Sequence, residues 1–147
     1  MVTTADKREI DNFESVSDQW WDPRGPMAPL HSFTPARIDY ILTNIERFWP
    51  ISKRKQASMS QPLVGLSILD IGCGGGLLAE PLARLGGTIT GIDVTPSAVE
   101  VASKHAIQNG LEIEYQCCTA EAFASRKQKF DVIYASEVIE HVADRSL

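Results

Sequence analysis

A glycine-rich stretch directly after an apolar run is the first place in the sequence that indicates chemistry. Residues 72–76 contain four glycines, and Asp70 stands two positions before the first of them. Glycines allow tight turns and a close approach of ligand to backbone, and a helix that follows offers unpaired N–H groups. Such a loop could bind a dinucleotide pyrophosphate. The dinucleotide fingerprint, however, requires a glycine where Leu77 stands.

The carboxylate of Asp70 changes the kind of ligand that this loop would accept. It would repel a pyrophosphate but suits a ligand with an ammonium group. Asp93 ends the β-branched run 88–93, where a carboxylate can accept hydrogen bonds from ribose hydroxyls. S-adenosylmethionine has a ribose, a cationic amino-acid tail and no phosphate. We therefore predict cofactor contacts at Asp70, Gly72, Gly74 and Asp93; a plain strand-to-helix turn for the glycines and a helix cap for Asp93 are the alternatives.

A second cluster of reactive side chains lies near the end of the chain. Glu137, Glu140 and His141 are spaced i, i+3 and i+4, so on a helix they would project from one face. They could hold a divalent cation, and Mg²⁺ suits two carboxylates better than Zn²⁺ does. His141 could instead be a general base, and Glu137 is the second predicted catalytic residue. A solvated polar face with an ion pair is the alternative to both.

Alternating strand and helix patterns must position these groups. The expected strands are 66–71, 88–93, 111–118 and 130–135, and the expected helices are 77–85, 95–109 and 120–124, with a further helical start at 136–143. Strands separated by helices predict an α/β fold with a parallel sheet, whose ligands bind at the carboxyl ends of the strands. Thr119 would then lie at the adenine edge of the site.

The first fifty residues differ from this pattern and form a predicted helical cap segment, 1–50. Its expected helices are 5–21 and a second one from Thr34–Pro35 to Pro50. The polar stretch 51–62 is predicted to be a linker, and 63–147 the cofactor domain. Trp20 and Trp21 are expected to serve packing rather than substrate binding, and His105 is expected at the surface.

Composition excludes several classes of function. The chain has 147 residues, 44% of them apolar, and a formal net charge of −5, which is unfavourable for binding nucleic acid. No apolar run is long enough to span a bilayer, and the N-terminus matches neither a signal nor a transit peptide. Three cysteines fit a reducing compartment, so we expect a cytoplasmic protein. Only four strands precede the last residue, so we expect the carboxyl-terminal part of the domain to be missing.

Five segments in a fixed order resemble a known family. They are FESVSDQWWD at 13–22, PLH at 29–31, PARIDYI at 35–41, DIGCGGGLLAE at 70–80 and EVIEHV at 137–142. Together they resemble the ubiquinone-biosynthesis O-methyltransferases, class I enzymes that use S-adenosylmethionine. The resemblance implies a Rossmann-like class I methyltransferase fold, of which this chain is the amino-terminal part with the first four strands.

The resemblance also implies a reaction and a set of site residues. The reaction is methylation of catechol-type hydroxyls on polyprenylated quinone precursors, 3-demethylubiquinol and the polyprenyl dihydroxyphenol or benzoate intermediate. Carried over by position, Arg37, Gly72, Asp93 and Ser136 contact S-adenosylmethionine, and Glu137, Glu140 and His141 bind Mg²⁺. Arg37 lies in the cap segment, which would therefore cover the cofactor as a lid. The polyprenylated substrate implies a peripheral contact with the inner membrane face (the matrix face in a eukaryote) and other quinone-biosynthesis enzymes as partners.

Three further hypotheses stay open beside this one. A dinucleotide-dependent oxidoreductase is disfavoured by Leu77 and Asp70. A different small-molecule methyltransferase would share the glycine loop. A non-catalytic remnant that binds cofactor, or serves as a partner subunit, would share the fold without the reaction.

Overall fold

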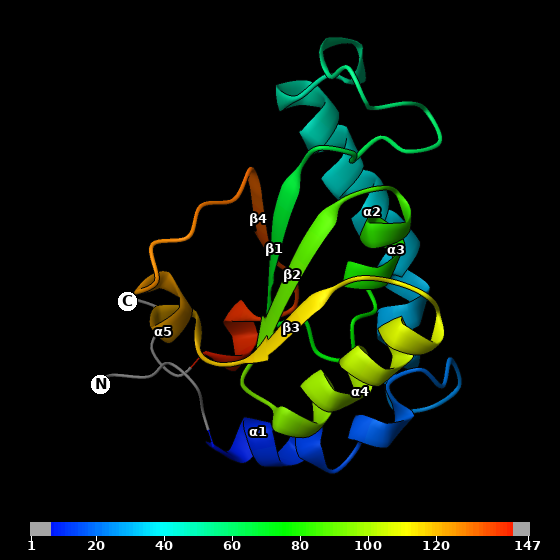
Figure 1. Ribbon diagram of the computed structural model, residues 1–147. Coiled ribbons are helices and arrows are strands. Elements are labelled where there is room, and N and C mark those ends of the chain that lie inside the picture. Colours follow the sequence, from blue (N-terminus) through cyan, green and yellow to red (C-terminus); the bar gives the residue numbers. More distant parts are fainter. Residues whose placement is uncertain (1–6, 143–147) are drawn as a thin grey trace.

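A parallel sheet of four strands forms the centre of the computed structural model, which describes residues 7–142 (Figure 1). The strands lie in the order β3-β2-β1-β4. Their bounds are Ser67–Ile71 for β1, Thr88–Asp93 for β2, Glu114–Cys117 for β3 and Val132–Ala135 for β4. The predicted α/β fold with a parallel sheet is confirmed, although β3 and β4 are shorter than the sequence pattern indicates.

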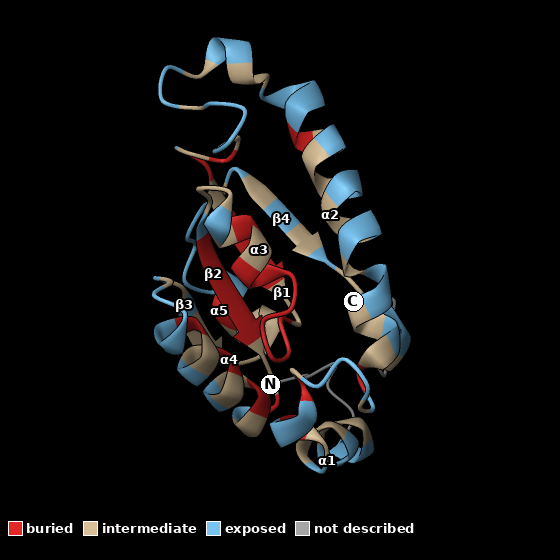
Figure 2. Cartoon of the chain, turned by 90° about the vertical axis from the view of Figure 1, so that its right-hand side faces the viewer, coloured by how far each residue is buried: buried red, intermediate tan, exposed pale blue. Residues whose placement is uncertain are grey.

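The two central strands hold most of the sheet's buried residues. β1 pairs with β2 from Ser67↔Thr88 to Ile71↔Ile92, and with β4 from Ile68↔Val132 to Ile71↔Ala135. Figure 2 shows β1 and β2 buried in the middle of the molecule, whereas β4 is only partly covered. Because all four strands run in the same direction, their carboxyl ends meet at one edge of the sheet.

Three helices connect the strands: α3 (Ala79–Arg84), α4 (Pro96–Gln108) and α5 (Ala120–Ala124). On α4, three buried alanines at four-residue spacing, Ala98, Ala102 and Ala106, give the helix a flat face that packs closely. The Thr119 hydroxyl accepts a hydrogen bond from the Ala122 N–H at 3.2 Å and caps α5. The predicted helices were therefore correct in place, with ends shifted by one or two residues at α3 and α4.

The N-terminal helices differ from the prediction. The described part of the expected helix 5–21 is α1 (Lys7–Glu14) followed by a short 3₁₀ turn, η1 (Ser17–Gln19). The next helix, α2 (Ala28–Phe48), begins six residues before Thr34, so the predicted start at Thr34–Pro35 is wrong. Pro29 already supplies the favourable first-turn proline. Pro35 is tolerated inside α2, where the preceding Thr34 hydroxyl donates to the Leu30 carbonyl at 2.7 Å.

The long helix α2 runs beside the sheet, with Ile45 as its one buried residue. Ile38, Ile41 and Leu42 on the same helix pack against the core partly buried. A second 3₁₀ turn, η2 (Ile51–Lys53), leads from α2 into the largely exposed segment before β1. None of the helices described in residues 7–142 has the length and apolar character needed to cross a bilayer.

Candidate functional site

The carboxyl ends of the strands open into a cavity of about 550 Å³, a volume within the usual range for small-molecule sites. All six residues predicted to contact the cofactor line it: Arg37, Asp70, Gly72, Gly74, Asp93 and Ser136. So do the two predicted catalytic residues, Glu137 and His141. The structure thus brings together groups that lie more than a hundred positions apart in the sequence, from Arg37 to His141.

The glycine loop adopts backbone angles that favour glycine. Gly72, Gly74 and Gly76 have φ values of +72°, +51° and +91°. A Cβ at Gly72 would overlap the Val138 side chain, and one at Gly74 would overlap the Trp20 ring. The glycines are therefore required by the protein's own packing as well as by any ligand that approaches the loop.

Asp93 ties the end of β2 to the glycine loop. Its Oδ2 accepts a hydrogen bond from the Gly74 N–H at 2.9 Å, and its Oδ1 accepts one from the Thr95 N–H at 2.8 Å. Each carboxylate oxygen can accept a second hydrogen bond. Asp93 therefore shapes the loop and retains acceptor capacity toward the cavity that it lines.

Asp70, near the end of β1, is a buried carboxyl with 3% of its surface exposed. Burial raises its pKa from 3.8 to about 7; the Tyr134 hydroxyl beside it lowers the pKa, and the charge of Asp93 raises it. The Tyr134 hydroxyl is itself buried and makes no well-aligned hydrogen bond within the described residues. A cationic ligand group beside Asp70 would favour its ionised form and so offset part of the cost of burial.

Arg37 reaches the site from α2. Its Nη2 lies 3.3 Å from Glu137 Oε1, in the segment after β4 that also contains Ser136. The Arg37 side chain is 16% exposed, and that of Glu137 is 54% exposed. The guanidinium is therefore held at the wall of the cavity by a carboxylate that faces solvent.

His141 also lines the cavity and contacts α1. Its Nδ1 is 2.9 Å from Glu9 Oε2, and its ring packs edge-on against Phe13. Glu14, on the same helix, accepts a hydrogen bond from the Ser97 N–H at 3.3 Å, at the start of α4. Helix α1 is thus joined to the sheet domain at two points, through Glu9 to His141 and through Glu14 to Ser97.

The predicted metal group is not formed. Residues 136–142 do not make the expected helix: Glu137 has a φ of +58°, and Ile139–His141 is a single 3₁₀ turn, η3. Without an α-helix the i, i+3, i+4 spacing does not align the three side chains. Glu137 pairs with Arg37, His141 with Glu9, and exposed Glu140 is not among the residues lining the cavity. Among residues 7–142, no three His, Cys, Asp or Glu side chains are grouped to hold a metal ion.

Sequence reasoning missed a set of contacts behind the glycine loop. His105, expected at the surface, is half-buried, stacks on Trp21 and pairs with the buried Glu80. Its neighbours on α4 are polar, which suggested exposure, and nothing local in the sequence indicates the approach of Trp21. Trp20 packs in the predicted manner, in a cluster with Met27, Leu77 and Ala98.

Known proteins are similar in sequence to nearly the whole chain. A model of the family described as "Methyltransferase domain" matches residues 69–147. The chain is 47% identical over 146 residues to the ubiquinone biosynthesis O-methyltransferase of Brucella ovis, covering 99% of this chain and 57% of that protein. It is 48% identical over 145 residues to the enzyme of the same name from Bartonella tribocorum, again with 99% and 57% coverage. The chain therefore spans a little over half the length of these relatives.

Solved structures show the same fold. Magnesium protoporphyrin IX methyltransferase from Synechocystis, with bound SAM, matches with a TM-score of 0.65 and 21% identity, covering 96% of this chain and 66% of that one. A ribosomal RNA methyltransferase from T. thermophilus matches with a TM-score of 0.51 and 22% identity over 65% of this chain and 24% of that one.

At these identities the solved structures establish the fold alone, and they confirm the Rossmann-like methyltransferase fold that the sequence predicts. The match to the family model covers more than half of the sequence and includes all four strands but the first residues of β1. The chain therefore belongs to the methyltransferase domain family.

Proposed function

We propose that the chain binds S-adenosylmethionine in the cavity at the carboxyl ends of the strands and is the cofactor-binding part of an O-methyltransferase. The observation that carries this proposal is the convergence of the glycine loop, Asp70, Asp93 and Arg37 on one cavity. These groups match a ligand with a ribose, an ammonium group and a carboxylate. The family membership and the SAM-bound neighbour of the same fold support it.

Each residue has a distinct task in this proposal. Asp93 accepts hydrogen bonds from the ribose hydroxyls, Asp70 binds the ammonium group, and Arg37 binds the carboxylate in exchange for Glu137. Gly72, Gly74 and Ser136 form the walls against which the ligand lies. Bound there, the cofactor supplies a methyl group on a sulfonium for in-line displacement, so the main contribution of the protein is alignment.

His141 is the proposed general base for the acceptor hydroxyl. When Nδ1 carries a proton toward Glu9, at 2.9 Å, the basic nitrogen of the ring is Nε2. Glu9 thereby orients the imidazole ring. Glu137 is the second proposed catalytic residue. Its carboxylate lies at the cavity wall and would be free to act once the cofactor carboxylate has replaced it at Arg37. The described residues do not fit a bound Mg²⁺, so no step is assigned to a metal ion.

The finer proposal concerns the substrate. The relatives named ubiquinone biosynthesis O-methyltransferases support a catechol-type hydroxyl on a polyprenylated quinone precursor as the methyl acceptor. Such an acceptor would be delivered at a membrane surface, so we propose a peripheral membrane contact and association with other enzymes of quinone biosynthesis. We further propose residues 1–50 as a cap over the cofactor, 51–62 as a linker and 63–147 as the cofactor domain; α1 and Arg37 at the cavity support the cap.

The first experiment is calorimetric titration of the chain with S-adenosylhomocysteine and, separately, with NAD⁺. Saturable binding of S-adenosylhomocysteine without binding of NAD⁺ is the expected result. The opposite preference would favour a dinucleotide-dependent oxidoreductase. Binding of neither by a cooperatively folded chain would overturn the proposal. Transfer of a labelled methyl group to a prenylated catechol, compared with an unprenylated one, tests the substrate separately.

A further inference from the structure

We propose that Trp21, held in place by His105 and Glu80, is a positioning residue that fixes the glycine loop of the cofactor site. This inference rests on the proposed function, because the loop is assigned to the cofactor. None of the three side chains is among the residues that line the cavity. They would therefore act on binding through the loop, without touching the ligand.

The first contact joins the cap segment to the loop itself. The Trp21 indole Nε1–H donates a hydrogen bond to the Gly75 carbonyl at 3.0 Å, across 54 positions of sequence. Gly75 stands between Gly74, which lines the cavity, and Gly76, which has a φ of +91°. A glycine-rich loop has many accessible backbone conformations, so a hydrogen bond at its middle selects one of them.

The second contact holds the indole in position. The rings of Trp21 and His105 stack with centroids 3.6 Å apart and planes 6° from parallel. His105 Nδ1 in turn lies 2.6 Å from Glu80 Oε1. Glu80 is 2% exposed, and its other oxygen lies 3.6 Å from Arg84 Nη2. The imidazole therefore cannot rotate away from the indole without leaving a buried carboxylate short of a partner.

The contacts close into a ring that includes the loop. The Glu80 backbone N–H donates to the Gly76 carbonyl at 3.1 Å. The sequence of contacts is thus Trp21 to Gly75, along the chain to Gly76, then Glu80, His105 and back to Trp21. Adjacent carbonyls of the loop are held from two sides, one by the cap segment and one by α3, with α4 joining them.

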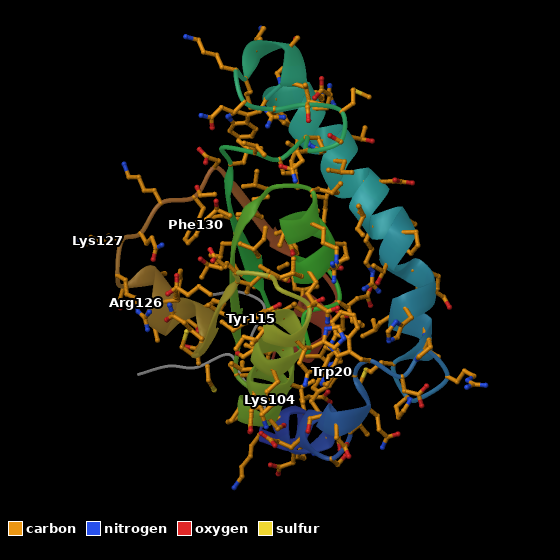
Figure 3. All side chains as sticks on the ribbon, turned by 45° about the vertical axis from the view of Figure 1, so that its right-hand side comes forward. Trp20, Lys104, Tyr115, Arg126, Lys127 and Phe130 are labelled. Atoms are coloured by element: carbon orange, nitrogen blue, oxygen red, sulfur yellow. The ribbon has the colours of Figure 1, made fainter. Side chains whose placement is uncertain are left out.

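The neighbouring tryptophan serves a different purpose. Trp20 lines the cavity and covers the loop, since a Cβ at either Gly74 or Gly75 would overlap its side chain. Its own indole N–H is buried and has no hydrogen-bond partner in the described part of the chain. The side chain of Trp20, labelled in Figure 3, is therefore held by packing, whereas the side chain of Trp21 acts through a directed hydrogen bond.

The test is Trp21→Phe, which keeps an aromatic ring for His105 and removes the N–H. We expect S-adenosylhomocysteine to bind about tenfold more weakly, the effect of about 1.4 kcal/mol, at a temperature where circular dichroism shows the variant folded. Trp49→Phe is the matched control, because Trp49 directly follows α2 and is not among the cavity-lining residues. Affinity equal to wild type in a folded Trp21→Phe chain would overturn the inference.

A second variant and a spectroscopic measurement separate positioning from general stability. His105→Gln retains a donor for Glu80 and loses the stacked ring, and should weaken binding about threefold. Hydrogen exchange of the Trp21 indole N–H, assigned with Trp21→Phe, should slow when S-adenosylhomocysteine binds; unchanged exchange would contradict coupling between the loop and Trp21. If wild type itself binds no S-adenosylhomocysteine, the proposed function fails first. If wild type binds and Trp21→Phe binds equally, this inference alone fails.

Discussion

The Arg37 guanidinium on α2 and the Glu137 carboxylate after β4 lie 3.3 Å apart, joining the cap segment to the carboxyl edge of the sheet. Because Glu137 is 54% exposed, this ion pair stabilises the fold by about 1 kcal/mol or less. More important for binding, the ion pair holds the Arg37 guanidinium at the cavity wall, where a ligand carboxylate could replace that of Glu137.

Replacing Arg37 with alanine should therefore affect binding more than folding. We expect Arg37→Ala to weaken S-adenosylhomocysteine binding by about tenfold or more, since a charge-assisted hydrogen bond contributes about 1.5–3 kcal/mol. Calorimetric titration measures this change. Arg47→Ala is the control, because Arg47 is exposed on the same helix and is not a cavity residue. Equal affinities of the Arg37 and Arg47 variants would contradict the assignment of Arg37.

Asp93 and Asp131 offer a matched pair of carboxylates. Asp131 accepts hydrogen bonds from the Ser67 N–H and hydroxyl, both at 2.8 Å, at the amino-terminal end of β1, away from the cavity. Each residue accepts two hydrogen bonds that alanine would lose, two from backbone N–H groups at Asp93 and one from a backbone N–H and one from a hydroxyl at Asp131, so each change should lower the free energy of unfolding by about 1–2 kcal/mol. Only Asp93→Ala should abolish measurable S-adenosylhomocysteine binding. Retained binding would show that Asp93 merely shapes the turn.

Alanine substitutions at Gly74 and Gly110 distinguish the cost of backbone strain from the cost of steric overlap. Both have positive φ, +51° and +67°, but a Cβ at Gly110 meets nothing within 4 Å, whereas one at Gly74 overlaps the Trp20 ring. Gly110→Ala should cost about 1 kcal/mol from its backbone angle alone. Gly74→Ala should cost about 2 kcal/mol more, because Trp20 must move. Urea unfolding of the two variants measures the difference, and equal losses would mean that the ring moves freely.

Asp70 should make stability depend on pH. Its pKa is raised from 3.8 to about 7 in the folded chain, first by burial. Between these values the folded chain holds a proton that the unfolded chain has released, so the contribution of Asp70 to stability is full below pH 4 and is lost as the pH rises toward 7. Wild type should therefore lose about 4 kcal/mol more than Asp70→Asn between pH 4 and pH 8. Urea unfolding of both chains measures this change. A difference in free energy of unfolding between wild type and Asp70→Asn that is the same at every pH would refute the raised pKa.

Addition of Mg²⁺ tests the corrected metal prediction. With Glu137 on Arg37 and His141 on Glu9, we expect no saturable Mg²⁺ binding at about millimolar concentration. Calorimetric titration of wild type and Glu140→Gln checks this. Saturable binding by wild type that Glu140→Gln loses would restore the three-residue site, and would mean that the segment after β4 rearranges around the ion.

The patterns in the sequence determined the sheet, the glycine loop and the cavity residues at the strand ends, whereas Arg37 followed only from the family resemblance. Alternation of apolar strands and helical patterns fixes which segments pair, and parallel strands bring their carboxyl ends together, so Asp70, Asp93 and Ser136 had to meet. Asp93 ends β2 as expected. Gly72 and Gly74 have positive φ values, which glycine adopts without the steric cost that other residues incur.

Only the tertiary structure decided what the N-terminal segment and the chain after β4 do. The spacing of Glu137, Glu140 and His141 is helical, but ion pairs with Arg37 and Glu9 and a left-handed backbone at Glu137 replaced the helix. His105 and Trp21, 84 positions apart, carry no local signal of their stacking. Contacts between distant segments depend on how whole elements pack, and periodicity along one element does not contain that information.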